Sequence, residues 1–114
     1  DPIMAERFVR LGAVLCCGTS RPGVGGGVTM VLAPLGGFIW SPVDLIAADG
    51  EAMTVLSPVR HGVGEDTVLR CTGGEVGDVA FRMVVTDAGA PDDRGKTVLC
   101  LRPTGLSAMP LRSW

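Results

Sequence analysis

Residues 6–34 read ERFVRLGAVLCCGTSRPGVGGGVTMVLAP, and this stretch decides between three classes of protein. It holds two apolar runs separated by a glycine-rich gap, and the first run ends in two adjacent cysteines. A phosphate-binding loop needs a strand, then glycines, then a helix that opens with a lysine-bearing motif. Here the glycines lead into the β-branched run VTMVLAP without a GK[ST] motif. The pattern therefore argues against a nucleotide-binding loop and predicts a hairpin tip.

The composition is typical of one globular domain over residues 1–114, with a core in residues 6–103 and a C-terminal extension in 104–114. Apolar residues make up 46% of the 114 residues and charged residues 19%, which excludes a disordered chain. The net charge of -2 gives no general attraction to nucleic acid or to an anionic membrane. Neither a membrane span nor a signal peptide is visible, so we expect an intracellular protein, cytoplasmic or organellar.

Short apolar runs broken by Gly and Pro predict an all-β fold of five strands. Residues 50–59, GEAMTVLSPV, form the one candidate helix, because Asp49 suits an N-cap and Pro58 ends the segment. A strand is the alternative for this segment. The predicted strands are residues 8–17, 28–33, 43–48, 67–72 together with 79–86 (as one strand or a strand pair), and 97–102.

The four cysteines leave two interpretations open. Cys16 and Cys17 are adjacent, and neighbouring residues of a strand point to opposite faces, so only one of them could reach a given core partner. The chain has no CxxC motif and a single histidine, so we expect no zinc site, no other metal and no cofactor. The cysteines are expected to be reduced and mostly buried; disulfides in an exported β-sandwich are the alternative.

The order of the predicted elements is that of the OB-fold, a five-stranded Greek-key barrel with one short helical connection between strands three and four. Residues 6–103 resemble the bacterial single-stranded-DNA-binding and primosomal replication protein family, and the small OB-fold proteins of kinetoplastid RNA-editing complexes. The resemblance rests on FVRLGAV with Gly12 as a bulge glycine, on GEDTVLRCTGG with Gly64 and Gly73, and on DAGAPDDRG as the last hairpin loop.

The resemblance implies binding of single-stranded DNA or RNA, of partner proteins, or of both, on the face of strands two and three between the first and last hairpin loops. Trp40 could stack on a base or serve as an apolar anchor. Phe81 alternates with core residues, so we expect it in the core. Asp92 and Asp93 beside Arg94 weaken the case for phosphate binding by that loop. The candidate nucleic-acid-binding residues are Arg10, Arg21, Phe38, Trp40, Arg70, Arg82, Arg94 and Lys96.

We expect no enzymatic activity. His61 is the only histidine, and its place in PVRHGVG predicts a solvated turn residue. The carboxylate pairs are adjacent in sequence and do not face each other across a cleft. Two other functions stay open: an OB-fold scaffold that binds only proteins, and an exported, disulfide-containing β-sandwich that binds a ligand. Mean hydropathy is high, so we expect protein partners or self-association.

Overall fold

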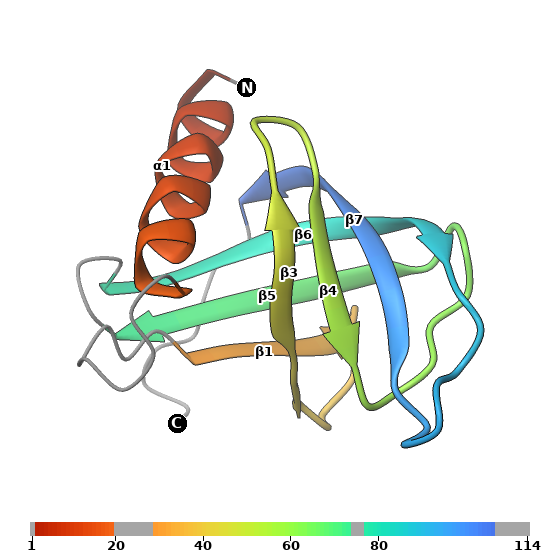
Figure 1. Cartoon of the computed structure of the whole chain (residues 1–114). Helices are drawn as coiled ribbons and strands as arrows, with labels where there is room; N and C mark the ends of the chain where they lie inside the picture. The colour runs from red at the N-terminus through yellow and green to blue at the C-terminus, as the bar shows by residue number, and fades with distance from the viewer. Residues whose placement is uncertain (1, 20–28, 74–76, 107–114) are drawn as a thin grey trace.

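The computed structural model describes residues 2–19, 29–73 and 77–106, which form one helix and a single antiparallel sheet of seven strands (Figure 1). The expected barrel-like sheet is confirmed, but the fold is mostly β and not all-β, because α1 is a long helix, and the expected count of five strands is wrong. Among the described residues, no helix has the length and apolar character needed to cross a membrane. The elements are α1 (Pro2–Thr19), β1 (Thr29–Pro34), β2 (Ser41–Pro42), β3 (Asp44–Ala48), β4 (Met53–Ser57), β5 (Asp66–Gly73), β6 (Gly77–Ala88) and β7 (Thr97–Leu106).

One segment of chain, residues 41–48, brings the two edges of this sheet together. The strand order is β2-β1-β5-β6-β7-β4-β3, so the edge strands β2 and β3 are consecutive in sequence. β2 pairs with β1, and β3 pairs with β4. Between them the buried Val43 donates its backbone N–H to the Met30 carbonyl at 3.1 Å. The segment therefore changes partner along its length and nearly closes the sheet into a barrel.

The strand order also contains a Greek key. β1, the 41–48 segment and β4 follow one another as antiparallel neighbours. β5 then returns to pair with the other side of β1. β5, β6 and β7 form a second meander, and β7 pairs with β4. This order of four strands defines the Greek key, although the OB-fold itself stays a prediction.

The predicted short helical connection is wrong, because residues 53–57 form β4. Met53, Val55 and Ser57 point inward and are fully buried, while the residues between them are half-buried. This period of two with β-branched residues is the strand pattern. Asp49 does not cap a helix. Its carboxylate accepts hydrogen bonds from the Glu51 and Ala52 N–H groups at 2.7 and 2.8 Å and shapes the β3–β4 turn.

The predicted first strand, residues 8–17, is also wrong, because these residues belong to α1. Met4, Phe8 and Leu11 recur at helical spacing and pack against the core, with Phe8 and Leu11 buried. On the exposed side, Arg10 lies 3.6 Å from Glu6 as an i,i+4 ion pair. Helical periodicity therefore outweighs the alternation that the sequence also contains.

This correction removes one of the residues on which the OB-fold resemblance rested. Gly12 lies in a helix and not at a strand bulge, and Cys16 and Cys17 are neighbours on a helix and not on opposite faces of a strand. Most of the glycine-rich gap that predicted a hairpin tip, residues 20–28, lies outside the described residues.

The remaining strand predictions are confirmed with shifted bounds. The runs 28–33, 43–48 and 97–102 correspond to β1, β3 and β7, and the run from 67 to 86 forms the pair β5 and β6. β7 continues to Leu106, into the stretch predicted to be a C-terminal extension.

The helix packs on the barrel through Phe8. Its ring meets that of Phe81 on β6 edge to face, with centroids 5.4 Å apart and planes at 84°. Both rings are fully buried. α1 also packs against β3 and β7, and Figure 1 shows it beside the turn that joins β3 and β4. The helix thereby completes the core at one end of the barrel.

Replacing Phe8 with alanine should lower the free energy of unfolding by about 3–5 kcal/mol, because a buried aromatic ring and its contact with Phe81 are lost. Urea denaturation followed by circular dichroism measures this change. Val9→Ala, on the exposed side of α1, is the matched control and should change stability by less than about 0.5 kcal/mol. If F8A does not fold, Phe8→Leu should show a smaller, measurable loss. Equal effects of F8A and V9A contradict this packing.

Candidate nucleic-acid interface

Three arginines form a diagonal row on the outer face of β5, β6 and β7. Inward positions of β5 and β6 pair buried residues, as Leu69 with Phe81, so the alternate positions point outward. Outward Arg70 on β5 lies opposite Ala80, and Arg82 on β6 is two residues further along. Such diagonal neighbours are about 7–8 Å apart.

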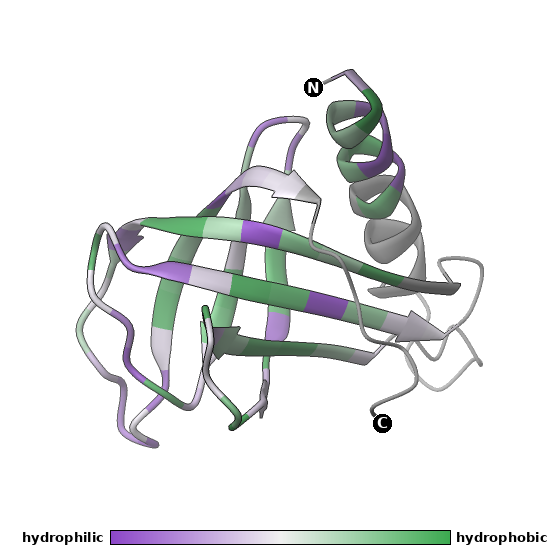
Figure 2. Ribbon diagram, turned by 180° about the vertical axis from the view of Figure 1, so that it is seen from behind, coloured by the Kyte–Doolittle hydropathy of each residue, from purple (hydrophilic) through white to green (hydrophobic). Residues whose placement is uncertain are grey.

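Arg102 on β7 continues the row. It lies opposite Val84, which is two residues beyond Arg82 on β6. Arg82 and Arg102 are exposed and Arg70 is half-buried. Neither Arg82 nor Arg102 forms an ion pair with another residue in the described parts of the chain. We name Arg70, Arg82 and Arg102 the arginine row. Figure 2 shows hydrophilic positions interrupting the hydrophobic ones along β5 and β6.

Arg70 and Arg82 were predicted as candidate residues and are brought together on one face, whereas Arg102 was missed. The sequence indicates an outward position for Arg102, because the buried Leu99 and Leu101 are two residues apart on one face of the strand and the next residue points to the other face. Outward acids lie within this row: Asp66 on β5 lies opposite Val84 and is a diagonal neighbour of Arg82, and Asp87 on β6 lies opposite Cys100, two residues along β7 from Arg102. The arginine row therefore brings three guanidinium groups onto one face, with acidic side chains as neighbours, on a chain whose net charge is negative.

The other candidate residues do not join the arginine row. Arg10 lies on α1 and is paired with Glu6. Phe38 and Trp40 lie between β1 and β2, where Phe38 is 95% exposed and Trp40 is half-buried. Arg21 lies outside the described residues. Phe81 is fully buried, as predicted, and cannot stack on a base.

Charged residues of the loop between β6 and β7 interact with nearby residues of the chain. Asp92 accepts hydrogen bonds from the Lys96 and Arg94 N–H groups, each at 2.8 Å, and these bonds hold the pKa of the Asp92 carboxyl below its usual range. The Lys96 ammonium lies 3.7 Å from the Asp44 carboxylate. Arg94 is exposed in the same loop. With Asp93 also present, the loop is not a cationic clamp for phosphate.

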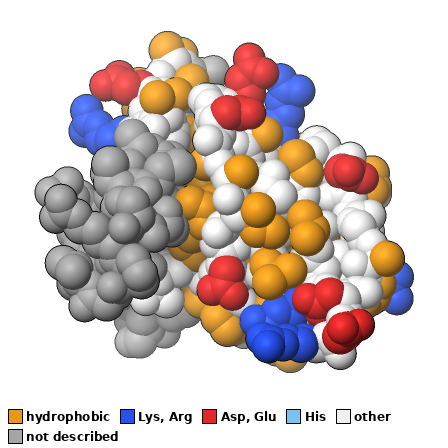
Figure 3. All heavy atoms as spheres, viewed as in Figure 1, with side chains coloured by type: hydrophobic (Ala, Val, Ile, Leu, Met, Phe, Trp, Pro, Cys, Tyr) orange, Lys and Arg blue, Asp and Glu red, His pale blue; other side chains and the backbone are white. Residues whose placement is uncertain are grey.

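A second outer face, on β3, β4 and β7, is apolar. Leu56 on β4 lies opposite Val98 on β7 and Asp44 on β3. Ile46 bulges from β3 beside them, and both Ile46 and Val98 are exposed. Figure 3 shows hydrophobic side chains gathered over this part of the barrel, with charged groups around them. We name Ile46, Leu56 and Val98 the apolar face.

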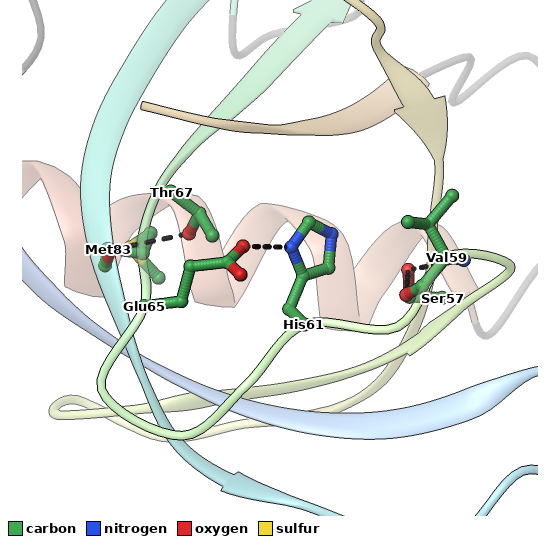
Figure 4. A network of polar contacts seen from close by, with 6 residues as sticks. All are labelled: Ser57, Val59, His61, Glu65, Thr67 and Met83. Atoms are coloured by element: carbon green, nitrogen blue, oxygen red, sulfur yellow. Dashed lines mark hydrogen bonds and ion pairs between the residues drawn. The ribbon is translucent and has the colours of Figure 1, made fainter. Parts of the chain in front are cut away.

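His61 is buried, which corrects the prediction of a solvated turn residue. It lies between β4 and β5 and is 6% exposed, and its Nδ1 hydrogen-bonds with Glu65 Oε2 (Figure 4). The Glu65 side chain remains partly exposed, so it links the buried ring to the surface. The His61 ring therefore lies inside the barrel end, and its partner Glu65 reaches the surface.

Within the described residues, no group of three or more His, Cys, Asp or Glu side chains could hold a metal ion. Searches among protein-family models, curated proteins and solved structures found no match to this chain. The described residues offer three features: the arginine row, the apolar face and a buried polar end of the barrel.

Burial raises the pKa of the Cys71 thiol to about 12, from 9.0 for an exposed thiol. Cys71 is fully buried on β5, and both Cys71 and Cys100 carry free thiols. Above pH 9 the unfolded thiol ionises while the folded one stays protonated, so rising pH favours unfolding until about pH 12. The contribution of the Cys71 thiol to the free energy of unfolding is fully present below pH 9, and it falls by about 1.4 kcal/mol per pH unit above pH 9.

Between pH 8 and pH 10, the free energy of unfolding should therefore fall by about 1.4 kcal/mol more in the wild type than in Cys71→Ala. Urea titrations at the two pH values measure the difference. The same burial should protect Cys71 from iodoacetamide in the folded protein but not in urea, as peptide mass spectrometry reports. An equal pH dependence in both proteins, or rapid native alkylation of Cys71, contradicts this placement.

Proposed function

We propose that this protein binds the sugar–phosphate backbone of single-stranded nucleic acid across the outer face of β5, β6 and β7. The observation that carries the proposal is the arginine row, in which Arg82 and Arg102 lie exposed on one sheet face without an ion-pair partner in the described residues. Guanidinium groups present planar pairs of N–H donors that match phosphate oxygens. A row of such groups suits the repeated charges of an extended strand.

The face lacks a means of reading sequence. Among the described outward residues of these three strands there is no aromatic side chain on which a base could stack, since Phe81 points inward. Binding on this face therefore rests on phosphate contacts, which carry no sequence information. Phe38 offers the one fully exposed ring of the described residues, and its loop begins next to β5, where Leu35 N–H donates to Asp66 O at 3.0 Å. A strand that passes this end could stack one base there.

The binding face differs from the one that the family resemblance implied. The resemblance implied the strands that correspond to β1 and β3. The outward positions Val31 and Ile46 on those strands are apolar, and Asp44 on β3 is acidic. The cations lie on β5, β6 and β7 instead. The proposal keeps single-stranded nucleic acid as the partner and moves the contact to the arginine row.

Fluorescence anisotropy with a labelled oligo-dT, measured over a range of salt concentrations, tests the proposal. For single strands, log Kobs falls with log salt by about 0.7 per phosphate contact, so Arg82→Ala/Arg102→Ala should weaken binding and flatten the slope by about 1.4. Arg7→Ala/Arg60→Ala removes the same charge from exposed positions on α1 and the β4–β5 loop and is the control. Binding without salt dependence, or equal losses in both double variants, would falsify the proposal. An oligo-U probe then distinguishes RNA from DNA.

A second candidate function, a module that binds proteins, is favoured by the apolar face. Ile46 on β3 and Val98 on β7 expose large side chains on the two sides of β4, and apolar side chains gathered on a surface mark interaction sites. This surface lies on the other side of β7 from Arg82, so the two functions are compatible in one molecule. The arginine row and the apolar face would then meet different partners.

If the apolar face mediates self-association, the weight-average mass of the wild type from light scattering should rise with protein concentration. Ile46→Thr/Val98→Thr, which keeps β-branched residues on both strands, should stay at the monomer mass. Thr54→Ser/Thr86→Ser, a conservative change at polar positions of β4 and β6, is the control. Identical concentration dependence in the wild type and in I46T/V98T contradicts a role for this face in self-association.

A further inference from the structure

Four polar side chains are buried at one end of the barrel. Ser57 ends β4, His61 follows it in the loop, Thr67 begins β5 next to the β4–β5 loop, and Thr97 begins β7. α1 lies elsewhere, since its Phe8 packs on Phe81 near the end of β7. The barrel thus has one end filled by apolar rings and another lined by hydroxyl and imidazole groups.

Two of the four side chains have their hydrogen bonds satisfied within the chain. The Ser57 hydroxyl donates to the Val59 carbonyl at 2.8 Å and accepts from the Val59 N–H at 3.2 Å. The Thr67 hydroxyl donates to the Met83 carbonyl at 3.3 Å. These bonds fold residues 57–59 back over the barrel end and fix the start of β5 to β6 (Figure 4).

The other two side chains each leave one buried atom without a hydrogen-bond partner among the described residues. These atoms are His61 Nε2 and Thr97 Oγ1. The His61 side chain is 2% exposed, and Thr97 is equally deeply buried. Buried polar atoms are almost always hydrogen-bonded, and each one left without a partner costs about 1–3 kcal/mol. Two such atoms at the same end of one barrel require a common explanation.

The hydrogen bond between His61 and Glu65 determines which kind of hydrogen-bond partner His61 Nε2 requires. An ionised carboxylate only accepts hydrogen bonds, so the Nδ1 that faces Glu65 carries the ring proton in the neutral imidazole. Nε2 then presents a lone pair and requires a donor. Thr97 Oγ1 carries a proton and requires an acceptor, and it can also accept. No other described group donates to the first atom or accepts from the second.

The strand register places Thr97 beside Ser57 at this end of the barrel. Thr97 lies directly opposite Ser57 in the β4–β7 ladder, and both side chains point inward. Figure 4 shows the second ring nitrogen of His61 turned away from Glu65, on the side where Ser57 lies. His61 Nε2 and Thr97 therefore both lie on the Ser57 side of this barrel end.

We propose that this polar end is a binding site for one internal water molecule, held by His61 Nε2 and Thr97 Oγ1. The water donates one hydrogen to the imidazole lone pair and accepts the hydrogen of the threonine hydroxyl, so both atoms are satisfied at once. Internal waters of this kind make about three hydrogen bonds to otherwise unsatisfied groups. The water links β7 to the β4–β5 loop, and Glu65 links that loop to the start of β5.

The Thr97→Val variant is expected to change the Tm in opposite directions, depending on whether the polar end of the barrel holds a water molecule or is dry. Valine has nearly the shape of threonine, so it removes the hydroxyl without leaving a cavity. With the water in place, the variant deprives it of one partner, and the Tm should fall by about 4 °C or more relative to the wild type. In a dry end, the variant removes an unsatisfied hydroxyl, and the Tm should rise. Thr54→Val on β4 controls for the general effect of this exchange in a strand.

A crystal structure of the wild-type protein at high resolution locates the water directly. The proposal expects one water oxygen about 2.7–3.2 Å from both His61 Nε2 and Thr97 Oγ1. It also expects this water to be absent or displaced in the T97V crystal. A dry end, a water that contacts only one of the two atoms, or a T97V melting temperature equal to or above that of T54V overturns the proposal.

Discussion

The change of partner along residues 41–48 is the constraint on which the rest of the structure depends. β2 pairs with β1 and β3 pairs with β4, so a single short segment supplies both edges of the sheet. An open seven-stranded sheet would expose two rows of unpaired backbone groups. The anchored Val43 between the two strands, buried and bonded to Met30, joins the edges instead. Inside and outside are thereby defined for every strand.

Closure of the sheet gives the inside and the outside of the barrel different kinds of side chain. The inward positions hold apolar residues around Phe81, with one end completed by Phe8 and the other by the buried polar residues near His61. The outward positions divide in turn, because β7 borders both the arginine row and the apolar face. A protein with a net charge of -2 can therefore gather three arginines on one face, although Asp66 and Asp87 lie beside them.

Strands with clean alternation, such as β5 and β7, were predictable from sequence because one periodicity fits them. The first element was not, because residues 8–17 are almost continuously apolar and only Met4 reveals the helical spacing. Asp49 misled because the same carboxylate chemistry caps helices and shapes turns. In the candidate interface, alternation predicted the outward Arg70 and Arg82. The row itself, like the contact between His61 and Glu65, follows from the strand register and the folded loop.

The most direct measurement of the proposed interface is an NMR titration of the folded protein with oligo-dT, following backbone amides and arginine side-chain Nε–H groups. We expect the largest chemical-shift changes at the side chains of Arg82 and Arg102 and at the outward residues around Val84, with α1 unaffected. Changes confined to α1 or to the β6–β7 loop, or no changes at low salt, would contradict binding on the arginine row.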